Sequence, residues 1–254
     1  MAGAQSQHRL GIALVVIAAV AFSTAPFFTR LLPYDSWTIL FWRGLFGGGL
    51  ITVMMVLLQG RAGLRELLGM STSGWLVTIY STLGMMAFIP SLQLTSVSNV
   101  AIIVGNARMG SDISGIALAC FMALAIAAMT VTVRRHKETS MVAAAAISNL
   151  LVCVVSIPFA HGITGITRFD LFILSMFGFF QVALGLTLFF LGSRLLPSGQ
   201  AALISTLETP LMPFWIWLAF AEVPGSRVVL GGALVMGAVI ADIIGGNREQ
   251  KPLT

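Results

Sequence analysis

Charged residues are scarce in this chain of 254 residues, where Asp, Glu, Lys and Arg together make up 9%. A soluble domain carries about 25% charged residues, so the shortage excludes a soluble globular protein. Instead, 57% of the residues are hydrophobic and the mean hydropathy is +0.97. The apolar segments run for about 20 residues without the alternation of a barrel strand. They therefore predict helices that span a lipid bilayer.

Cysteine and histidine are also rare. Cys120 and Cys153 both lie inside apolar segments, and the three histidines are scattered along the chain. This pattern predicts neither a disulfide nor a metal site. The chain has no phosphate-binding Gly-Lys-Ser/Thr loop and no convergent set of polar residues. We therefore expect no cofactor, no ATP-driven transport and no enzyme activity.

The net charge of +5 and the pI near 10.0 raise the question of a nucleic-acid partner. The basic residues, however, lie in short loops between apolar runs, as they do in cytoplasmic loops of membrane proteins. No stripe of Lys and Arg is interleaved with aromatic residues. We expect the lipid bilayer, and not nucleic acid, to be the main partner.

Eight apolar segments are long enough to cross a bilayer, which predicts an all-α polytopic membrane protein with about 8 transmembrane helices. They lie at about 10–29, 37–58, 74–94, 113–133, 140–160, 170–192, 199–221 and 226–246. A ninth stretch, 97–107, would extend only about 16 Å as a helix, half of a hydrocarbon core about 30 Å thick. We predict that this stretch does not span.

The chain repeats itself at an offset of about 101 to 104 residues. Residues 11–14 recur unchanged as 115–118, and residues 94–103 align with 195–204. Such duplication in an apolar chain predicts a transporter built from two related halves. We divide the chain into a first repeat at 1–111, with three helices and the short stretch, and a complete second repeat of five helices at 112–254. The first copy therefore lacks its last two helices.

The distribution of basic residues predicts the orientation. With the amino terminus inside and eight crossings, nine Lys and Arg residues lie on the inner side and four on the outer side. This is the direction that the positive-inside rule requires. We expect a multi-pass protein of the cell inner (plasma) membrane with both termini cytoplasmic.

Three motifs in this order resemble a known family. They are Phe41-Trp42-Arg43-Gly44, the run from Gln200 to Pro210, and the glycine-rich segment 231–237. The chain resembles EamA-type permeases of the drug/metabolite transporter (DMT) superfamily, whose members have ten helices in two inverted repeats. The resemblance implies a secondary transporter that exports small metabolites or amino acids by alternating access around a site between the repeats.

The shortened first repeat leaves three hypotheses open. The chain is a working carrier, either with eight helices or as a homodimer that covers the gap. Alternatively, it is a non-transporting membrane subunit that needs a partner. The third hypothesis is a defective product of an in-frame deletion. The missing fourth helix is the counterpart of the segment that carries Glu208, so one wall of the substrate cavity is affected.

Two charged residues inside the spans are the main candidates for the translocation pathway. An arginine at the centre of a helix costs about 2.5 to 3.5 kcal/mol on insertion scales. Arg43 therefore faces either the pathway or, by snorkelling, the membrane interface. Glu208 lies near mid-depth, and Pro210 and Pro213 free backbone carbonyls one turn earlier. A carboxyl at such a helix break binds a cationic substrate group or exchanges a proton, or else hydrogen-bonds to a neighbouring helix.

Polar residues inside other spans complete the candidate set. Tyr80, Ser81 and Gln181 either line a cavity or form hydrogen bonds between helices. The run Gly47-Gly48-Gly49 follows Arg43 by one turn, and we predict that it permits close helix packing. Thirteen methionines supply an adaptable apolar surface that suits a permissive pathway.

Overall fold

The computed structural model describes residues 2–94, 112–136 and 140–249. Over these residues the chain is helical and contains no strand, as the sequence predicted. Eight helical stretches within them are long and apolar enough to cross a membrane, so the polytopic all-α fold is confirmed. They are Ser6–Leu31, Ser36–Gln59, Thr72–Leu94, Ser114–Val133, Met141–Phe159, Arg168–Ser193, Gly199–Phe220 and Ser226–Ile243. The short apolar stretch at 97–107 lies outside the described residues.

Several spans consist of more than one helix, because breaks interrupt them. The helices are α1 (Ala2–Ser23), α2 (Ala25–Leu31), α3 (Ser36–Gln59), α4 (Arg61–Leu68), α5 (Thr72–Leu94), α7 (Asp112–Arg135), α8 (Met141–Ser156), the 3-10 turn η1 (Ile157–Phe159), α9 (Arg168–Phe177), the π-helical segment η2 (Gly178–Leu184), α10 (Gly185–Ser193), α11 (Ser198–Ser205), α12 (Glu208–Phe220) and α13 (Ser226–Glu249). The first span comprises α1 and α2, the sixth comprises α9, η2 and α10, and the seventh comprises α11 and α12.

Side-chain caps define where several spans begin. The carboxylate of Asp35 accepts a hydrogen bond from the backbone N–H of Thr38 at 2.9 Å and so caps α3. The hydroxyl of Ser140 caps α8 in the same way, and the hydroxyl of Thr167 caps α9. At its other end, α3 stops at Gly60, whose φ of 58° favours glycine. These caps satisfy backbone donors that lipid cannot satisfy.

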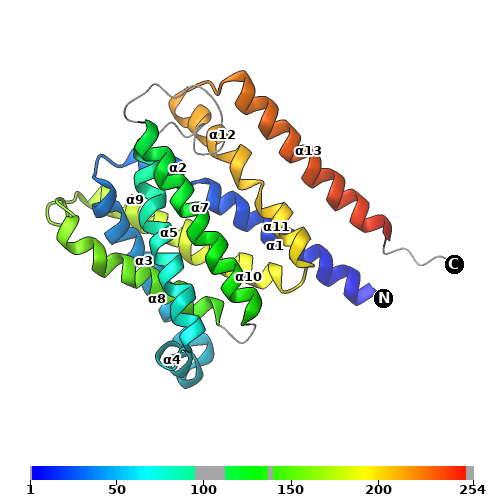
Figure 1. Ribbon diagram of the computed structural model, residues 1–254, viewed down its shortest axis with the longest axis horizontal. Coiled ribbons are helices and arrows are strands. Elements are labelled where there is room, and N and C mark those ends of the chain that lie inside the picture. Colours follow the sequence, from blue (N-terminus) through cyan, green and yellow to red (C-terminus); the bar gives the residue numbers. More distant parts are fainter. Residues whose placement is uncertain (1, 95–111, 137–139, 250–254) are drawn as a thin grey trace.

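The helix pairs follow a two-fold pattern (Figure 1). Helix α3 packs against α8, α1 packs against α10, and α5 packs against α7. Likewise α3 contacts η2, and α5 contacts α8. In chain order, α1 corresponds to α7, α3 corresponds to α8, and α5 corresponds to the sixth span. Exchanging corresponding helices turns the α1–α10 contact into the α5–α7 contact, and the α3–η2 contact into the α5–α8 contact. This is the pattern that a pseudo-two-fold axis through the α3–α8 pair produces.

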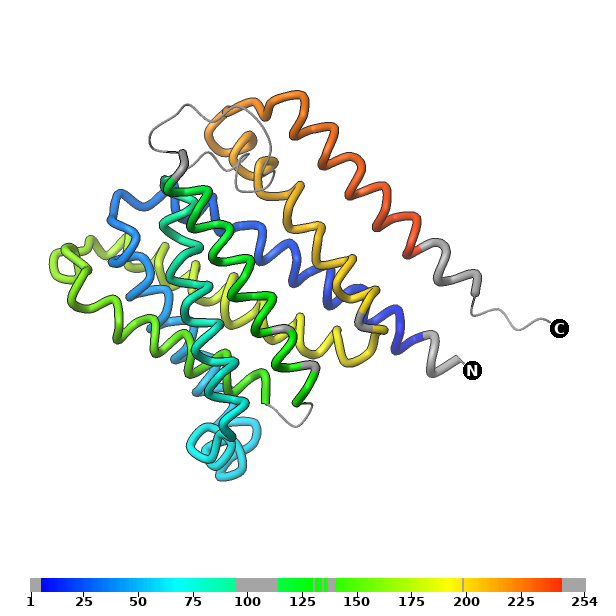
Figure 2. Tube along the Cα trace, viewed as in Figure 1, coloured from blue at the N-terminus to red at the C-terminus, as the bar shows by residue number. Residues whose placement is uncertain are grey.

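The pattern is incomplete at α7. Helices α1 and α2 also pack against α11 and α12, as Figure 2 shows for the blue and gold segments. Helix α7, which holds the corresponding place in the second half, packs chiefly against α5. Accordingly, 12% of the residues in the apolar part of Ser114–Val133 are buried, against 44% in the apolar part of Ser6–Leu31. Helix α13 lies at the edge of the molecule, against α12 and α11 (Figure 1).

Glycines on α3 permit its close contacts with two neighbours. A Cβ at Gly44 would lie 2.5 Å from the carbonyl oxygen of Asn149 on α8, and a Cβ at Gly48 would lie 2.9 Å from a backbone nitrogen of the same helix. A Cβ at Gly47 would lie 2.5 Å from Val182 in η2. Gly49 differs, because a Cβ there would meet no atom within 4 Å. The packing prediction is therefore confirmed for Gly47 and Gly48 and wrong for Gly49.

Candidate translocation cavity

A cavity of about 270 Å³ between α3, α5, α7, η2 and α12 is lined by four of the residues that the sequence singled out. Arg43 comes from α3, Ser81 from α5, Gln181 from η2 and Glu208 from the start of α12. The structure thus brings together residues from both halves of the chain. The fifth candidate, Tyr80, is half-buried on α5 and does not line this cavity.

The guanidinium of Arg43 points inward and is almost completely buried, with 4% of the residue exposed. Its Nε donates a hydrogen bond to Oε1 of Gln181 at 2.6 Å. Its Cζ lies 5.4 Å from the centre of the Phe177 ring, within the range of a cation–π contact. Its Nη1 is shielded from solvent and has no hydrogen-bond partner among the described residues. Arg43 therefore does not snorkel to the interface, and part of its hydrogen-bonding capacity is free.

Gln181 reaches Arg43 from a π-helical segment, η2, which interrupts the sixth span between α9 and α10. Such π-turns are rare and often occur at functional sites. Gly178 begins η2, and a Cβ there would lie 2.7 Å from Cβ of Phe46 and 2.9 Å from the backbone nitrogen of Gly47. The glycine thus lets η2 approach α3 closely enough for Gln181 to contact Arg43. The apolar sequence of this span gave no signal for the π-turn.

Glu208 lies at a break in the seventh span, where α11 ends at Ser205 and α12 begins. Pro210 has no N–H for the carbonyl of Thr206, which instead accepts a shorter-range hydrogen bond from Thr209 at 3.1 Å. Helix α12 continues through Pro213. The carboxyl of Glu208 thus sits at a helix N-terminus, where the dipole favours negative charge. No hydrogen-bond or ion-pair partner for this carboxyl occurs among the described residues.

Ser81 makes a hydrogen bond that corresponds to the Arg43–Gln181 contact. Its hydroxyl donates to Oγ of Ser148 on α8 at 3.2 Å. In the two-fold pattern α8 corresponds to α3, and α5 corresponds to the sixth span. Both contacts join the two halves, and Ser148 and Ser81 occupy the places that correspond to those of Arg43 and Gln181. The remaining lining is largely apolar and includes four methionines: Met85, Met122, Met129 and Met212.

Eight membrane-length helices and a cavity lined by Arg43 and Glu208 define a polytopic helical membrane protein with charged groups between its spans. The sequence model of the EamA-like transporter family matches residues 113–241, just over half of the chain. The chain belongs to this family, as the sequence motifs predicted. The match includes Gln181, Glu208, Pro210 and Pro213, whereas Arg43 and Ser81 lie before it.

Comparison with solved structures supports the fold. One structure, described as "Crystal structure of protein", is 15% identical to this chain with a TM-score of 0.56. The alignment covers 97% of this chain and 99% of that chain. At this identity the similarity concerns the fold alone. No curated protein sequence matches the chain significantly.

Proposed function

We propose that this protein is a secondary transporter that exports small metabolites or amino acids by alternating access around the cavity. The observation that carries the proposal is the placement of Arg43 and Glu208. Both line one cavity, they come from opposite halves of the chain, and no ion pair joins them in the structure. An arginine at the centre of a membrane helix costs about 2.5 to 3.5 kcal/mol, so a buried and partly unpaired guanidinium favours a role in binding.

The size and lining of the cavity support a small solute. Its volume of about 270 Å³ lies just below the range of about 300–1,000 Å³ that is typical of pockets for drug-sized ligands. In this proposal Arg43 attracts an anionic group of the solute, and Glu208 binds a cationic group or exchanges a proton. The four methionines adapt to the apolar remainder of the solute.

We propose that the halves are a truncated first repeat at 1–111 and a complete second repeat at 112–254. The two-fold pattern of helix contacts supports this division, and the family match falls within the second repeat. The low burial of α7 is then a consequence of the truncation, because the first repeat lacks the helices that would cover it. The nine-to-four distribution of basic residues supports an inner-membrane protein with both termini cytoplasmic.

The exposed α7 also favours a role for a partner. Since α11 and α12 cover α1 but nothing described covers the corresponding face of α7, we propose that a second copy of the chain packs there. The second candidate function, a non-transporting subunit, has the same support. The two differ in transport activity and are separated by the experiment that follows.

The test uses proteoliposomes loaded with a mixture of the proteinogenic amino acids, with efflux of each compound measured by mass spectrometry. We expect efflux of at least one compound, with a loss of about tenfold or more in Arg43→Gln and Glu208→Gln. Glu208→Gln is also expected to change the pH dependence of any remaining efflux. Tyr80→Phe is the matched control, because Tyr80 does not line the cavity.

Two results would contradict the proposal. The first is unchanged efflux and unchanged pH dependence in both cavity variants. The second is the same loss in Tyr80→Phe as in the cavity variants, which would indicate a general effect on folding. Absence of efflux for every compound in the unmodified protein would favour the non-transporting subunit.

A further inference from the structure

The first and seventh spans run parallel at a constant register. His8 Nε2 lies 2.8 Å from Gln200 Oε1, and Trp215 Nε1 donates to Ser23 Oγ at 2.8 Å. Further along, the ring centres of Phe27 and Phe220 are 6.2 Å apart, and Arg30 forms an ion pair with Glu222. In each of these contacts the partners are separated by 192 or 193 residues. The seventh span therefore follows the first over its whole length.

The two outermost contacts lie at opposite ends of this helix pair. From His8 to Arg30 a helix rises about 33 Å, which matches a hydrocarbon core about 30 Å thick. The His8–Gln200 pair thus belongs to one membrane face and the Arg30–Glu222 pair to the other. Between them, Phe22 and Glu208 line the cavity. Each contact therefore lies at one end of the helix pair that borders the cavity.

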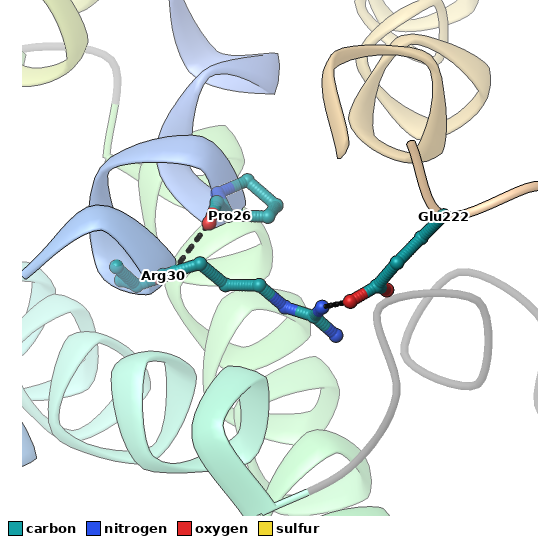
Figure 3. Close-up of polar contacts among 4 residues, drawn as sticks. Pro26, Arg30 and Glu222 are labelled. Atoms are coloured by element: carbon teal, nitrogen blue, oxygen red, sulfur yellow. Dashed lines mark hydrogen bonds and ion pairs between the residues drawn. The ribbon is translucent and has the colours of Figure 1, made fainter. Parts of the chain in front are cut away.

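Both members of the helix pair are interrupted between the two contacts. The first span breaks at Thr24, and Pro26 follows in the first turn of α2. The seventh span breaks between α11 and α12, before Pro210. As a result Arg30 and Glu222 lie beyond these breaks, whereas His8 and Gln200 lie before them. Figure 3 shows Arg30 reaching from the short helix that contains Pro26 to Glu222, in the segment that follows α12.

The Arg30–Glu222 contact is built to open easily. The two side chains are 30% and 54% exposed, and exposed ion pairs contribute little to stability. Glu222 follows Ala221, whose left-handed backbone conformation (φ 55°) ends α12 and turns the chain toward α13. The other contact, His8–Gln200, is a single side-chain pair on helices α1 and α11.

We propose that these two pairs are the gates of the transporter, with the breaks at Thr24 and before Pro210 as hinges. Opening of Arg30–Glu222 moves α2 away from the end of α12 and exposes the cavity on that side. Opening of His8–Gln200 moves α1 away from α11 and exposes the cavity on the other side. The inference rests on the proposed alternating-access function, because it assigns the contacts that such a cycle must break.

The test measures access to the cavity from each side and needs no substrate. Ser81→Cys serves as the reporter in a protein with Cys120→Ala and Cys153→Ala. A membrane-impermeant maleimide is applied to right-side-out or inside-out vesicles. Two gate variants remove one contact each: Arg30→Glu and Gln200→Leu. Two exchange variants restore a contact with reversed partners: Arg30→Glu with Glu222→Arg, and His8→Gln with Gln200→His.

We expect Arg30→Glu to raise the labelling rate about two- to fivefold from the Arg30 side only, and its exchange variant to return the rate to the starting value. Gln200→Leu and its exchange variant should behave in the same way from the His8 side. Labelling from both sides that no gate variant changes would overturn the gates and leave alternating access intact. Labelling of the starting protein from one side alone, unchanged in all variants, would contradict alternating access and the gates together.

Discussion

Two glycines five residues apart on α3 are expected to respond in opposite ways to the same substitution. At Gly44 an added Cβ would lie 2.5 Å from the carbonyl oxygen of Asn149 and 3.2 Å from the backbone nitrogen of Cys153. Both of these atoms belong to the backbone of α8, so no rotamer change relieves the overlap. At Gly49 an added Cβ meets no atom within 4 Å.

The expected energies follow from these distances. The Gly44→Ala contact is roughly 1 Å shorter than ordinary van der Waals contact, so α3 and α8 must separate. Such overpacking costs about 1–3 kcal/mol of unfolding free energy. Gly49→Ala lowers the conformational entropy of the unfolded chain and stabilises the helix by about 0.5–1 kcal/mol. We therefore expect the two variants to differ by about 1.5–4 kcal/mol.

The measurement is reversible unfolding in mixed micelles by titration with dodecyl sulfate, followed by far-ultraviolet circular dichroism. The free energies of Gly44→Ala, Gly49→Ala and the unmodified protein are compared at one lipid-to-detergent ratio. Equal stability of the two variants would refute the argument, because it would show that α3 and α8 are not in close contact at Gly44.

Three further predictions concern pH, assembly and orientation. The Tyr34 hydroxyl donates to Asp170 Oδ2 at 2.8 Å, and this hydrogen bond raises the pKa of Tyr34 above 10.0. The stabilisation is present below about pH 10 and is lost as pH rises through the raised pKa. Tyr34→Phe should therefore lower Tm at neutral pH but not at strongly alkaline pH. A Tm difference between this variant and the unmodified protein that stays the same at every pH would exclude this cause. Cys120 is exposed on α7, whereas Cys153 is buried. Oxidation in membranes should therefore yield a disulfide-linked dimer that Cys120→Ala abolishes. Recovery of monomer alone would argue against packing of a second copy on α7. An epitope tag beside His136 should stay inaccessible to impermeant reagents in intact cells, since the surrounding basic loop is predicted to be cytoplasmic; labelling would reverse the orientation.

Much of the fold could be predicted from the sequence, because a bilayer allows few solutions. Apolar segments of about 20 residues must be helices there, so composition and length alone predicted the eight spans. The break before Glu208 was also predictable in kind, since Pro210 cannot donate a backbone hydrogen bond. The position of the break was not predictable, because Pro213 lacks the same backbone donor and yet α12 continues through it.

The candidate site was only partly predictable. Arg43, Gln181, Ser81 and Glu208 are isolated polar residues in the sequence, and nothing local distinguishes them from Tyr80, which does not line the cavity. A side chain's position around its helix depends on packing with neighbours, and the π-turn at η2 changes that position for Gln181. Whether Arg43 snorkels or faces inward was undecided for the same reason.

The sequence by itself determined that the chain is a helical membrane protein, and its internal similarity predicted two related halves of which the first is shorter. Each follows from composition, segment length or alignment of the chain with itself, and none requires contacts between distant residues. Only the tertiary structure decided that Gly44 and Gly48 pack closely against α8 while a Cβ at Gly49 would meet no atom, that Arg43 bonds to Gln181, and that the first and seventh spans meet at both ends. These contacts join residues more than one hundred positions apart in the chain. They depend on the shape of the surrounding side chains.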